Sequence, residues 1–310
     1  MSGSRVSQGV APEPLGEISV VKAWVIASRP KTLIAAAAPA LVGTGLASLH
    51  GVRAWLPALA AMVGGILIQI GTNFANDYYD FLRGGDTAER VGPVRVTQAG
   101  ILPPRTVRTG MIVVLAAAML VGVYLVWVAG WPIVWIGLTS VACAVLYTGG
   151  PYPLAYHGLG DLFVFVFFGL VAVGGTYYVQ GLSWPPDALL AGAGLGALST
   201  AILVVNNLRD IETDTKANKR TLAVRLGPGA TKVEYLLTLV VAFLVPIVGV
   251  RWMNWPAATL ASLAFVPLAI APTRAVFGYS DPRELLPALG ATARVVVVYC
   301  ILLSLGLALG

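Results

Sequence analysis

The sequence predicts an all-α polytopic membrane protein, and three observations support this fold class. Of the 310 residues, 57% are hydrophobic and only 11% are charged, and the mean hydropathy is +0.82. Soluble domains carry roughly 25% charged residues. Apolar stretches close to the length of a membrane-spanning helix recur along the whole chain, and lysine and arginine are concentrated in alternate connections between them. We therefore expect one bundle of spans rather than two soluble domains.

The apolar stretches predict nine transmembrane helices. The eighth contains or adjoins three helix-interrupting prolines, Pro256, Pro267 and Pro272. The predicted spans cover residues 32–48, 56–74, 107–128, 132–147, 159–180, 188–205, 235–250, 257–271 and 292–308.

The positions of the charged residues predict the orientation in the cell membrane. With the N-terminus inside, 18 of the 20 lysines and arginines lie on inside segments, and only Arg53 and Arg251 lie outside. The positive-inside rule then places the N-terminus in the cytoplasm and the C-terminus on the outer side. Of the 14 acidic residues only Asp187 falls on an outside loop, so we expect the chemistry at the cytoplasmic face.

The ends of the chain and its two cysteines carry little functional signal. Residues 1–22 lack an apolar core of a signal peptide, so we expect a flexible cytoplasmic tail, an interfacial helix near residues 20–28, and a membrane domain over residues 23–310. Cys143 and Cys300 lie in separate apolar segments, with neither disulfide nor zinc spacing, and we expect both to be inert.

Two clusters of Asn and Asp residues stand at the ends of predicted spans. In residues 73–80 (NFANDYYD), Asn73, Asp77 and Asp80 share one broad helical face. In residues 206–214 (NNLRDIETD), Asn206, Asp210 and Asp214 are spaced four apart. Carboxylates at the end of a membrane span are costly and indicate a functional site. Two oxygen-rich faces suggest one shared site for a hard cation.

The loops after both clusters combine these carboxylates with basic residues. Mg²⁺ is commonly held by one or two carboxylates together with substrate phosphates, and Arg and Lys bind phosphate oxygens. A diphosphate bridged by Mg²⁺ between the clusters would use both kinds of group. A solvated cytoplasmic loop or simple helix capping is the alternative for either cluster alone, but two matching clusters favour function. An anion transporter is a second alternative, although transporter sites usually lie near the membrane midplane.

These residues resemble the UbiA superfamily of intramembrane prenyltransferases. Its NDxxD and DxxxD motifs match residues 76–80 (NDYYD) and 210–214 (DIETD). The longer form of the first motif would have an acid at position 84, where this chain has Gly84, and Asp86 is the nearest acid. Five further segments resemble the branch that prenylates 1,4-dihydroxy-2-naphthoate: residues 29–33 (RPKTL), 90–95 (RVGPVR), 147–154 (YTGGPYPL), 206–210 (NNLRD) and 219–227 (KRTLAVRLG).

The resemblance implies nine helices around a central cavity open to the cytoplasmic side, in two pseudo-repeats that each carry an Asp-rich motif. It implies Mg²⁺-dependent transfer from polyprenyl diphosphate to 1,4-dihydroxy-2-naphthoate with decarboxylation, giving demethylmenaquinol for menaquinone biosynthesis. The implied metal ligands are Asn76, Asp80, Asp210 and Asp214. The implied catalytic residues are Asp77, Asp80, Asp210, Asp214, Tyr147 and Asp161. The implied substrate-binding residues are Arg29, Lys31, Asn73, Arg90, Tyr152, Arg209, Lys216, Lys219 and Arg220.

Within this scheme, aromatic faces would stabilise an allylic cation, with Tyr147, Tyr152 and Phe74 as candidates. Asp161 would orient the acceptor hydroxyls, and Arg29 with Lys31 would attract its carboxylate. The expected partners are the two substrates and the lipid bilayer, without nucleic acid. Another aromatic acceptor, such as 4-hydroxybenzoate or homogentisate, is the alternative within the family. Neither prenyl length nor oligomeric state follows from the sequence.

Overall fold

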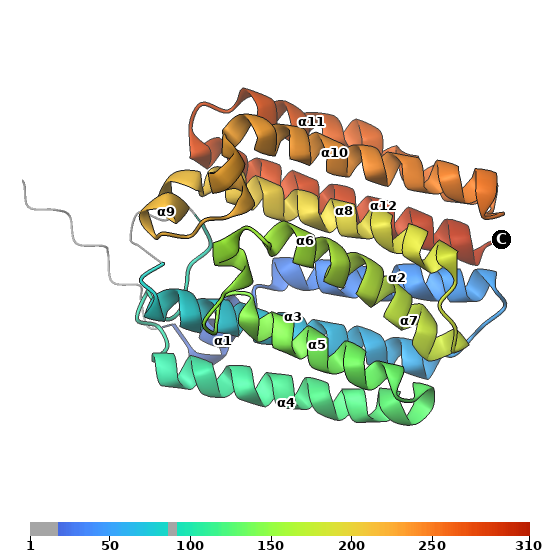
Figure 1. Ribbon diagram of the computed structural model, residues 1–310, viewed down its shortest axis with the longest axis horizontal. Coiled ribbons are helices and arrows are strands. Elements are labelled where there is room, and N and C mark those ends of the chain that lie inside the picture. Colours follow the sequence, from blue (N-terminus) through green and yellow to red (C-terminus); the bar gives the residue numbers. More distant parts are fainter. Residues whose placement is uncertain (1–17, 86–91) are drawn as a thin grey trace, which may run out of the picture.

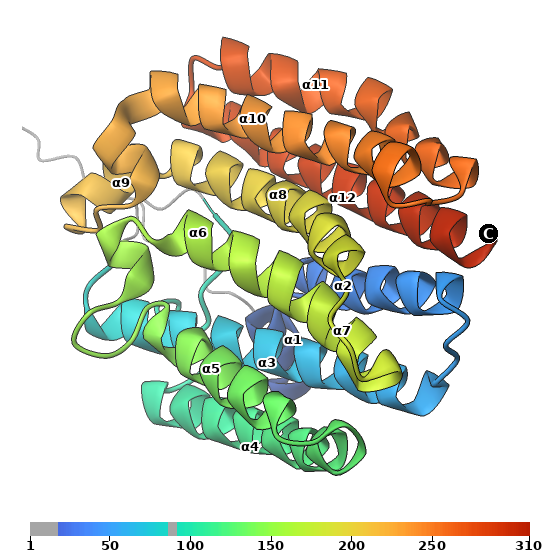
Figure 2. The same ribbon diagram turned by 45° about the vertical axis from the view of Figure 1, so that its right-hand side comes forward.

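The protein is described by a computed structural model that covers residues 18–85 and 92–310. Its regular elements are all helical, and the long helices run side by side along the long axis of the bundle (Figures 1 and 2). Eight helices in the described residues are long and apolar enough to cross a membrane. The predicted all-α polytopic membrane fold is therefore confirmed. Arg90 and Asp86 lie outside the described residues, as does the side chain of Lys31.

One of the nine predicted spans, the fourth (residues 132–147), is shorter than the others in the structure. It forms α5 (Pro132–Leu146), an apolar helix of 15 residues. At a rise of 1.5 Å per residue this helix is about 22 Å long, which is less than the hydrocarbon core of a typical bilayer. Nine full-length spans are therefore not confirmed. The C-terminus lies at the opposite end of the bundle from the loops that follow α3 and α8 (Figure 1).

The turn between the first two helices lies beside Asn73 of the first Asp-rich cluster. α1 (Val20–Ser28) is capped by the Ser19 side chain, and its exposed valines fit the predicted interfacial helix. Arg29 adopts a left-handed conformation, with φ of 52°, and turns the chain from α1 into α2 (Pro30–Leu49). α2 packs on α12 (Leu285–Ala308), where Gly45 is required because a Cβ there would lie 2.6 Å from the Ser304 carbonyl oxygen.

Both helices that carry the clusters extend beyond their predicted spans. α3 (Trp55–Leu82) continues through the whole first cluster, so its Asn and Asp side chains share a helical face as predicted. α8 (Pro186–Arg209) ends before Asp210, whose φ of −96° and ψ of 8° break the helix. The short α9 (Ile211–Lys216) then carries Asp214. The second cluster therefore bends around a helix junction instead of lying on one helix.

The remaining spans contain several interruptions. One span consists of α6 (Gly160–Val164), the π-helical η2 (Phe165–Val171) and α7 (Ala172–Gly181). Another consists of the 3-10 helix η3 (Ala257–Ala264) and α11 (Phe265–Gly278). α10 (Leu222–Trp252) begins 13 residues before its predicted span and kinks at Gly227, with φ of 77°. α4 (Pro104–Ala129) is regular, and two short turns are η1 (Leu154–His157) and η4 (Pro282–Glu284).

The buried core lies mainly in the C-terminal half of the bundle. α8 is its central helix, packing on α10, α12 and η2. Where η2 crosses α8, a Cβ on Gly169 would lie 2.4 Å from the Gly192 carbonyl oxygen, so this close approach requires glycine. A cavity lies among α2 to α5 and η2, and residues of α8 and α12 also line it. The cavity therefore borders the packed core directly.

Candidate active site

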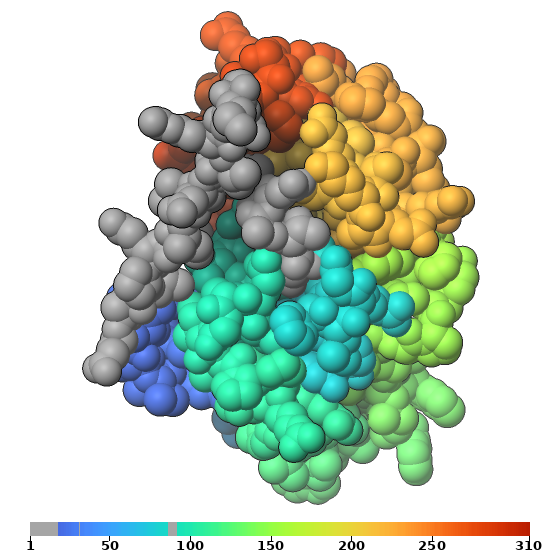
Figure 3. Space-filling model, turned by 90° about the vertical axis from the view of Figure 1, so that its left-hand side faces the viewer, coloured from blue at the N-terminus to red at the C-terminus, as the bar shows by residue number. Residues whose placement is uncertain are grey.

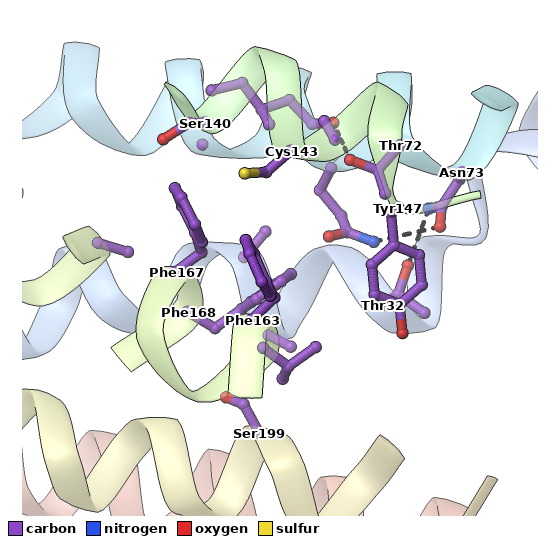
Figure 4. Close-up of a pocket in the computed structure, with 18 of the residues that line it drawn as sticks. Thr32, Thr72, Asn73, Ser140, Cys143, Tyr147, Phe163, Phe167, Phe168 and Ser199 are labelled. Atoms are coloured by element: carbon purple, nitrogen blue, oxygen red, sulfur yellow. Dashed lines mark hydrogen bonds between the residues drawn. The ribbon is translucent and has the colours of Figure 1, made fainter. Parts of the chain in front are cut away.

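A cavity of about 1190 Å³ lies between α2, α3, α4, α5, the α6–α7 span and α8. Along α3 its wall runs from Ala61 to Asp80 at intervals of three or four residues. At 1.5 Å per residue this wall is about 29 Å long, close to the thickness of a bilayer's hydrocarbon core. Deep in the cavity the wall is largely apolar and includes the stacked rings of Phe163 and Phe167 (Figure 4). Polar side chains gather at one end.

Asp80 stands at the polar end and is 3% exposed. Its Oδ2 accepts a hydrogen bond from Arg95 Nη2 at 3.0 Å, and its Oδ1 accepts one from the Tyr156 hydroxyl at 3.0 Å. Arg95 is itself buried, so the pair is shielded from water and its charges interact strongly. These contacts hold the Asp80 carboxylate in one orientation at the wall of the cavity.

Asp77 has a different environment from Asp80, although it belongs to the same motif. Its Oδ2 accepts from the Val96 backbone amide at 3.0 Å, and its Oδ1 accepts from the Thr97 amide at 2.9 Å. The side chain does not line the cavity. Both of its oxygens therefore anchor the loop that carries Arg95, and Arg95 in turn holds Asp80.

The asparagines of α3 form a second polar layer in the cavity wall. Asn73 donates to the Ser28 carbonyl oxygen at 2.8 Å and to Thr32 Oγ1 at 3.0 Å, and it accepts from Gln69 at 3.1 Å (Figure 4). Asn76 accepts from Thr148 Oγ1 at 2.9 Å. Asn73 thus joins α3 to the α1–α2 turn, whereas the Asn76 side chain stays at the cavity surface beside Asp80.

The second motif surrounds a buried arginine. Arg209 donates Nε to Asp210 Oδ1 at 2.7 Å and Nη2 to Asp210 Oδ2 at 2.6 Å, and Nη2 also donates to Asn206 Oδ1 at 2.8 Å. Arg209 is 3% exposed and Asp210 is 5% exposed. Two parallel hydrogen bonds of this kind fix the geometry of an Arg–carboxylate pair. In this structure Arg209 holds Asp210, and any metal ion at Asp210 would share the carboxylate with it.

Asp214 lies across from the first motif. Burial raises the pKa of its carboxyl group to about 6, the Lys219 ammonium 3.5 Å away opposes this rise, and repulsion by Asp210 and Asp80 adds to it. Lys219 lines the same cavity as Asp80, so its ion pair with Asp214 places the second motif next to the first. Figure 3 views this end of the bundle, where α9 (yellow) and the end of α3 (cyan) reach the surface. The structure thus brings together two clusters that are about 130 residues apart in sequence.

Asp161, at the start of α6, lines the cavity wall on the α8 side. Its Oδ1 accepts from Asn207 Nδ2 at 3.5 Å, and its buried Oδ2 has no hydrogen-bond partner among the described residues. Tyr147 is also in the wall, with its hydroxyl close to Gly160 (Figure 4). This part of the cavity offers a hydrogen-bond acceptor to a bound molecule.

Other predicted site residues are spread over several places. Arg29 and Lys219 line the cavity, while Lys216 is exposed outside it. Tyr152 is exposed and stacks on His157, with ring centroids 3.5 Å apart, and Phe74 packs on Trp24 instead of facing the cavity. Arg220 lines a second, smaller pocket.

Sequence reasoning did not single out Arg95 or Tyr156 as site residues. Arg95 closes the segment 90–95 that carries part of the family resemblance, so its position could have indicated a role. Tyr156 stands in a turn of ordinary composition, and no sequence pattern marks it. Only the folded chain shows that its hydroxyl reaches Asp80.

The oxygen ligands fit a Mg²⁺ ion that is completed by substrate. No group of three or more His, Cys, Asp or Glu side chains in the described part of the chain is placed to hold a metal by itself. Asp214 Oδ2 is nevertheless buried and has no hydrogen-bond partner among the described residues, and the oxygen-bearing side chains of Asn76 and Asp80 line the cavity. Mg²⁺ usually binds one or two carboxylates and takes its other ligands from water and phosphate.

Comparison with known proteins agrees with this architecture. Among solved structures, a UbiA homologue from Aeropyrum pernix K1 superposes with a TM-score of 0.69 at 15% identity, covering 87% of this chain and 96% of that one. A UbiA homologue from Archaeoglobus fulgidus bound to GPP and Mg²⁺ gives a TM-score of 0.61 at 15% identity, covering 91% and 99%. At this level of identity the likeness shows a shared fold.

Sequence relatives are more similar. A 1,4-dihydroxy-2-naphthoate octaprenyltransferase of Mycobacterium tuberculosis is 40% identical over 287 residues, or 93% of this chain and 97% of the relative. Proteins of the same name from Haemophilus influenzae and Bacillus subtilis are 38% and 34% identical, covering 94% and 95% of this chain and 97% and 93% of theirs. The sequence model of the UbiA prenyltransferase family matches residues 36–295. The chain therefore belongs to the UbiA prenyltransferase family.

Proposed function

We propose that this protein transfers a polyprenyl group from polyprenyl diphosphate to 1,4-dihydroxy-2-naphthoate, with loss of CO₂, giving demethylmenaquinol for menaquinone biosynthesis. The observation that carries this proposal is the long, mainly apolar cavity with Asp80 in its wall at one end, beside Lys219, which pairs with Asp214 of the second motif. The names of the sequence relatives support the acceptor and a polyprenyl donor.

The cavity suits the two parts of the donor. Its apolar length accommodates an isoprenoid chain, while the polar end accommodates the diphosphate. Asn76, Asp80, Asp210 and Asp214 would hold Mg²⁺, which would neutralise charge on the diphosphate as it leaves. Lys219 and Arg95 lie in the same wall and add positive charge for phosphate oxygens.

In the proposed reaction CO₂ leaves from the ring carbon that gains the prenyl group, so no ring proton has to be removed. The allylic C–O bond of the donor breaks, and the diphosphate takes the bonding electrons. The ring carbon that bears the carboxylate forms the new C–C bond, and the bond to that carboxylate then breaks and returns its electrons to the ring as CO₂ leaves. In this scheme Asp161 Oδ2 accepts a hydrogen bond from an acceptor hydroxyl, and Arg29, at the same cavity, faces the acceptor carboxylate.

We also propose that the polar end of the cavity faces the cytoplasm at the cell membrane. The excess of lysine and arginine on the connections at that end supports this orientation. A transporter is less compatible with the geometry, because the ionisable groups of the cavity cluster at one end of the bundle instead of near its middle.

The direct test is incubation of purified protein in detergent with Mg²⁺, polyprenyl diphosphate and candidate acceptors. We expect demethylmenaquinol from 1,4-dihydroxy-2-naphthoate, and loss of product with EDTA. Product from 4-hydroxybenzoate or homogentisate in its place would refute the acceptor. Uptake of an anion into proteoliposomes without any prenylated product would refute the enzyme.

Substitution of Gly137 by leucine is expected to discriminate against long donors. Gly137 lines the cavity from α5, and a Cβ there meets nothing within 4 Å, so the added side chain enters the open space. We expect kcat/KM to fall by about tenfold or more for a long polyprenyl diphosphate, equivalent to ~1.4 kcal/mol, and to change little for geranyl diphosphate. Ala116→Leu, on the exposed side of α4, is the matched control. Equal losses for both donor lengths would contradict this path for the chain.

Proton competition at Asp214 is expected to make Mg²⁺ activation depend on pH. Because burial raises the pKa of this carboxyl group to about 6, it carries a proton below that pH and cannot then bind Mg²⁺ as a carboxylate. The Mg²⁺ concentration for half-maximal activity should therefore rise as pH falls from 7 to 5. Since Lys219 lowers this pKa, Lys219→Gln should move the transition to higher pH. Mg²⁺ titrations at fixed pH values measure both effects, and a pH-independent midpoint would contradict them.

A further inference from the structure

A second pocket, of about 400 Å³, lies outside the cavity at the same end of the bundle. Three arginines and a histidine contribute to it, and no carboxylate of the described residues does: its wall includes Arg83, Tyr156, His157, Arg220 and Arg225. Arg83 caps the end of α3, His157 ends η1, and Arg225 lies in the first turns of α10. We call this site the basic pocket. None of its residues other than Arg220 was expected to bind a substrate.

Two of the three arginines of the basic pocket are held in place by groups without a negative charge. Arg83 Nη2 donates to the Gly150 carbonyl oxygen, and its guanidinium lies over the Tyr156 ring, 5.5 Å from the centroid. Arg225 Nε donates to the Arg220 carbonyl oxygen at 3.2 Å. Backbone carbonyls and an aromatic ring orient these cations but carry no full negative charge. Among the described residues, none of the three arginines forms an ion pair with a carboxylate.

A concave site with three uncompensated guanidinium groups favours an anion of high charge. The planar fork of arginine matches phosphate oxygens and forms paired hydrogen bonds with them. Three such groups, with an imidazole beside them, provide more donors than one carboxylate can accept. The geometry therefore points to a phosphate or diphosphate group as the ligand.

The basic pocket adjoins the active site at Tyr156 and at the neighbouring residues Lys219 and Arg220. The Tyr156 hydroxyl donates to Asp80, while the same side chain forms part of the pocket wall. Lys219 Nζ lies 5.7 Å from the Tyr156 ring centroid and pairs with Asp214, and Arg220 follows it directly in sequence. An anion in the pocket would therefore contact the residues next to both metal-binding motifs.

We infer that the basic pocket is a second, metal-independent binding site for a phosphate-bearing anion. Two sources could supply the ligand: the inorganic diphosphate released by the reaction, or the headgroup of an anionic phospholipid in the cytoplasmic leaflet. Both present phosphate oxygens to the same arginines. Binding requires neither Mg²⁺ nor turnover, so it can be measured even if the proposed acceptor is wrong.

The first arm of the test is calorimetric titration of the full-length protein with inorganic diphosphate in neutral detergent and EDTA. We expect saturable binding that weakens about tenfold in Arg225→Gln and further in the Arg83→Gln/Arg225→Gln double variant. Arg108→Gln removes the same charge at the same end of the bundle but outside the pocket, and should bind as the unmodified protein does.

The second arm compares thermal unfolding in nanodiscs of phosphatidylcholine with and without phosphatidylglycerol. A higher Tm with phosphatidylglycerol, lost in the double variant and kept in Arg108→Gln, identifies the lipid headgroup as the ligand. Binding of diphosphate with the variant pattern above identifies the free anion. If the pocket variants change neither diphosphate affinity nor the lipid-dependent Tm, the inference is wrong.

Discussion

Replacing Asp80 with asparagine is expected to lower kcat/KM by about 10²–10³-fold, the loss typical of removing one group that stabilises charge in a transition state. The substituted amide has nearly the same shape but no negative charge, so it binds Mg²⁺ weakly and no longer neutralises Arg95, whose Nη2 lies 3.0 Å from Asp80 Oδ2. Steady-state kinetics over a Mg²⁺ series measure this effect. The half-saturating Mg²⁺ concentration should rise along with the loss of kcat.

Stability and catalysis can be separated at this position. The Arg95–Asp80 pair is buried, with side-chain exposures of 5% and 4%, and removing one partner of such a pair usually costs about 3–5 kcal/mol. In Asp80→Asn/Arg95→Met neither charge remains alone, so we expect thermal stability to recover in part while activity stays lost. Asp187→Asn, at a buried carboxylate paired with His50 at the other end of the bundle, should retain most activity. Full activity of Asp80→Asn would refute the metal-binding scheme.

Replacing Asp77 with asparagine is expected to lower kcat by about 10²-fold through a different cause. The structure places both Asp77 oxygens on the backbone amides of Val96 and Thr97, at 3.0 and 2.9 Å. An asparagine must turn its NH₂ group toward one of these N–H donors, which leaves a buried donor unpaired at a cost of about 1–3 kcal/mol. The loop then no longer holds Arg95 against Asp80, and a displacement of about 1 Å can cost 10²-fold in rate.

Two measurements distinguish this role from that of Asp80. Amide hydrogen exchange should accelerate at Val96 and Thr97 in Asp77→Asn, because their hydrogen-bond acceptors are disturbed, and should stay slow in Asp80→Asn. The half-saturating Mg²⁺ concentration should change much less in Asp77→Asn than in Asp80→Asn. An equal shift in both variants would show that Asp77 is a metal ligand and that its role as a loop anchor is secondary.

The two neighbouring aspartates illustrate the limits of sequence reasoning about the site. Helical periodicity predicted that Asp77 and Asp80 lie on one face of a helix, and both are in α3. Such a face depends only on local backbone geometry. It could not tell them apart, because the partner of each carboxylate comes from residues 15–76 positions further along the chain. The roles assigned to these residues stay predictions until the variants are measured.

The predicted spans were correct in type and approximate in extent. Hydropathy ends a span where polar residues begin, so it stopped the second span at residue 74, whereas α3 continues to Leu82. Asp77 and Asp80 in that last section are buried and accept hydrogen bonds from residues 95–97, and burial with hydrogen bonds lets a helix continue through them. In the second cluster the helix is shorter than expected. The spacing of four between Asn206, Asp210 and Asp214 suggested one continuous helical face, but α8 ends at Arg209 and α9 begins at Ile211.

By itself, the sequence determined the membrane-embedded helical fold, the family and the two carboxylate clusters. These follow from hydropathy, charge distribution and short motifs, which are properties of consecutive residues. Tertiary structure alone decided that Arg95 and Tyr156 hold Asp80, that Asp77 anchors the loop at residues 96–97, and that Arg220 belongs to a separate basic pocket. The physical reason is that hydrogen bonds and ion pairs depend on which side chains packing brings within about 3 Å, and this distance is unrelated to their separation along the chain.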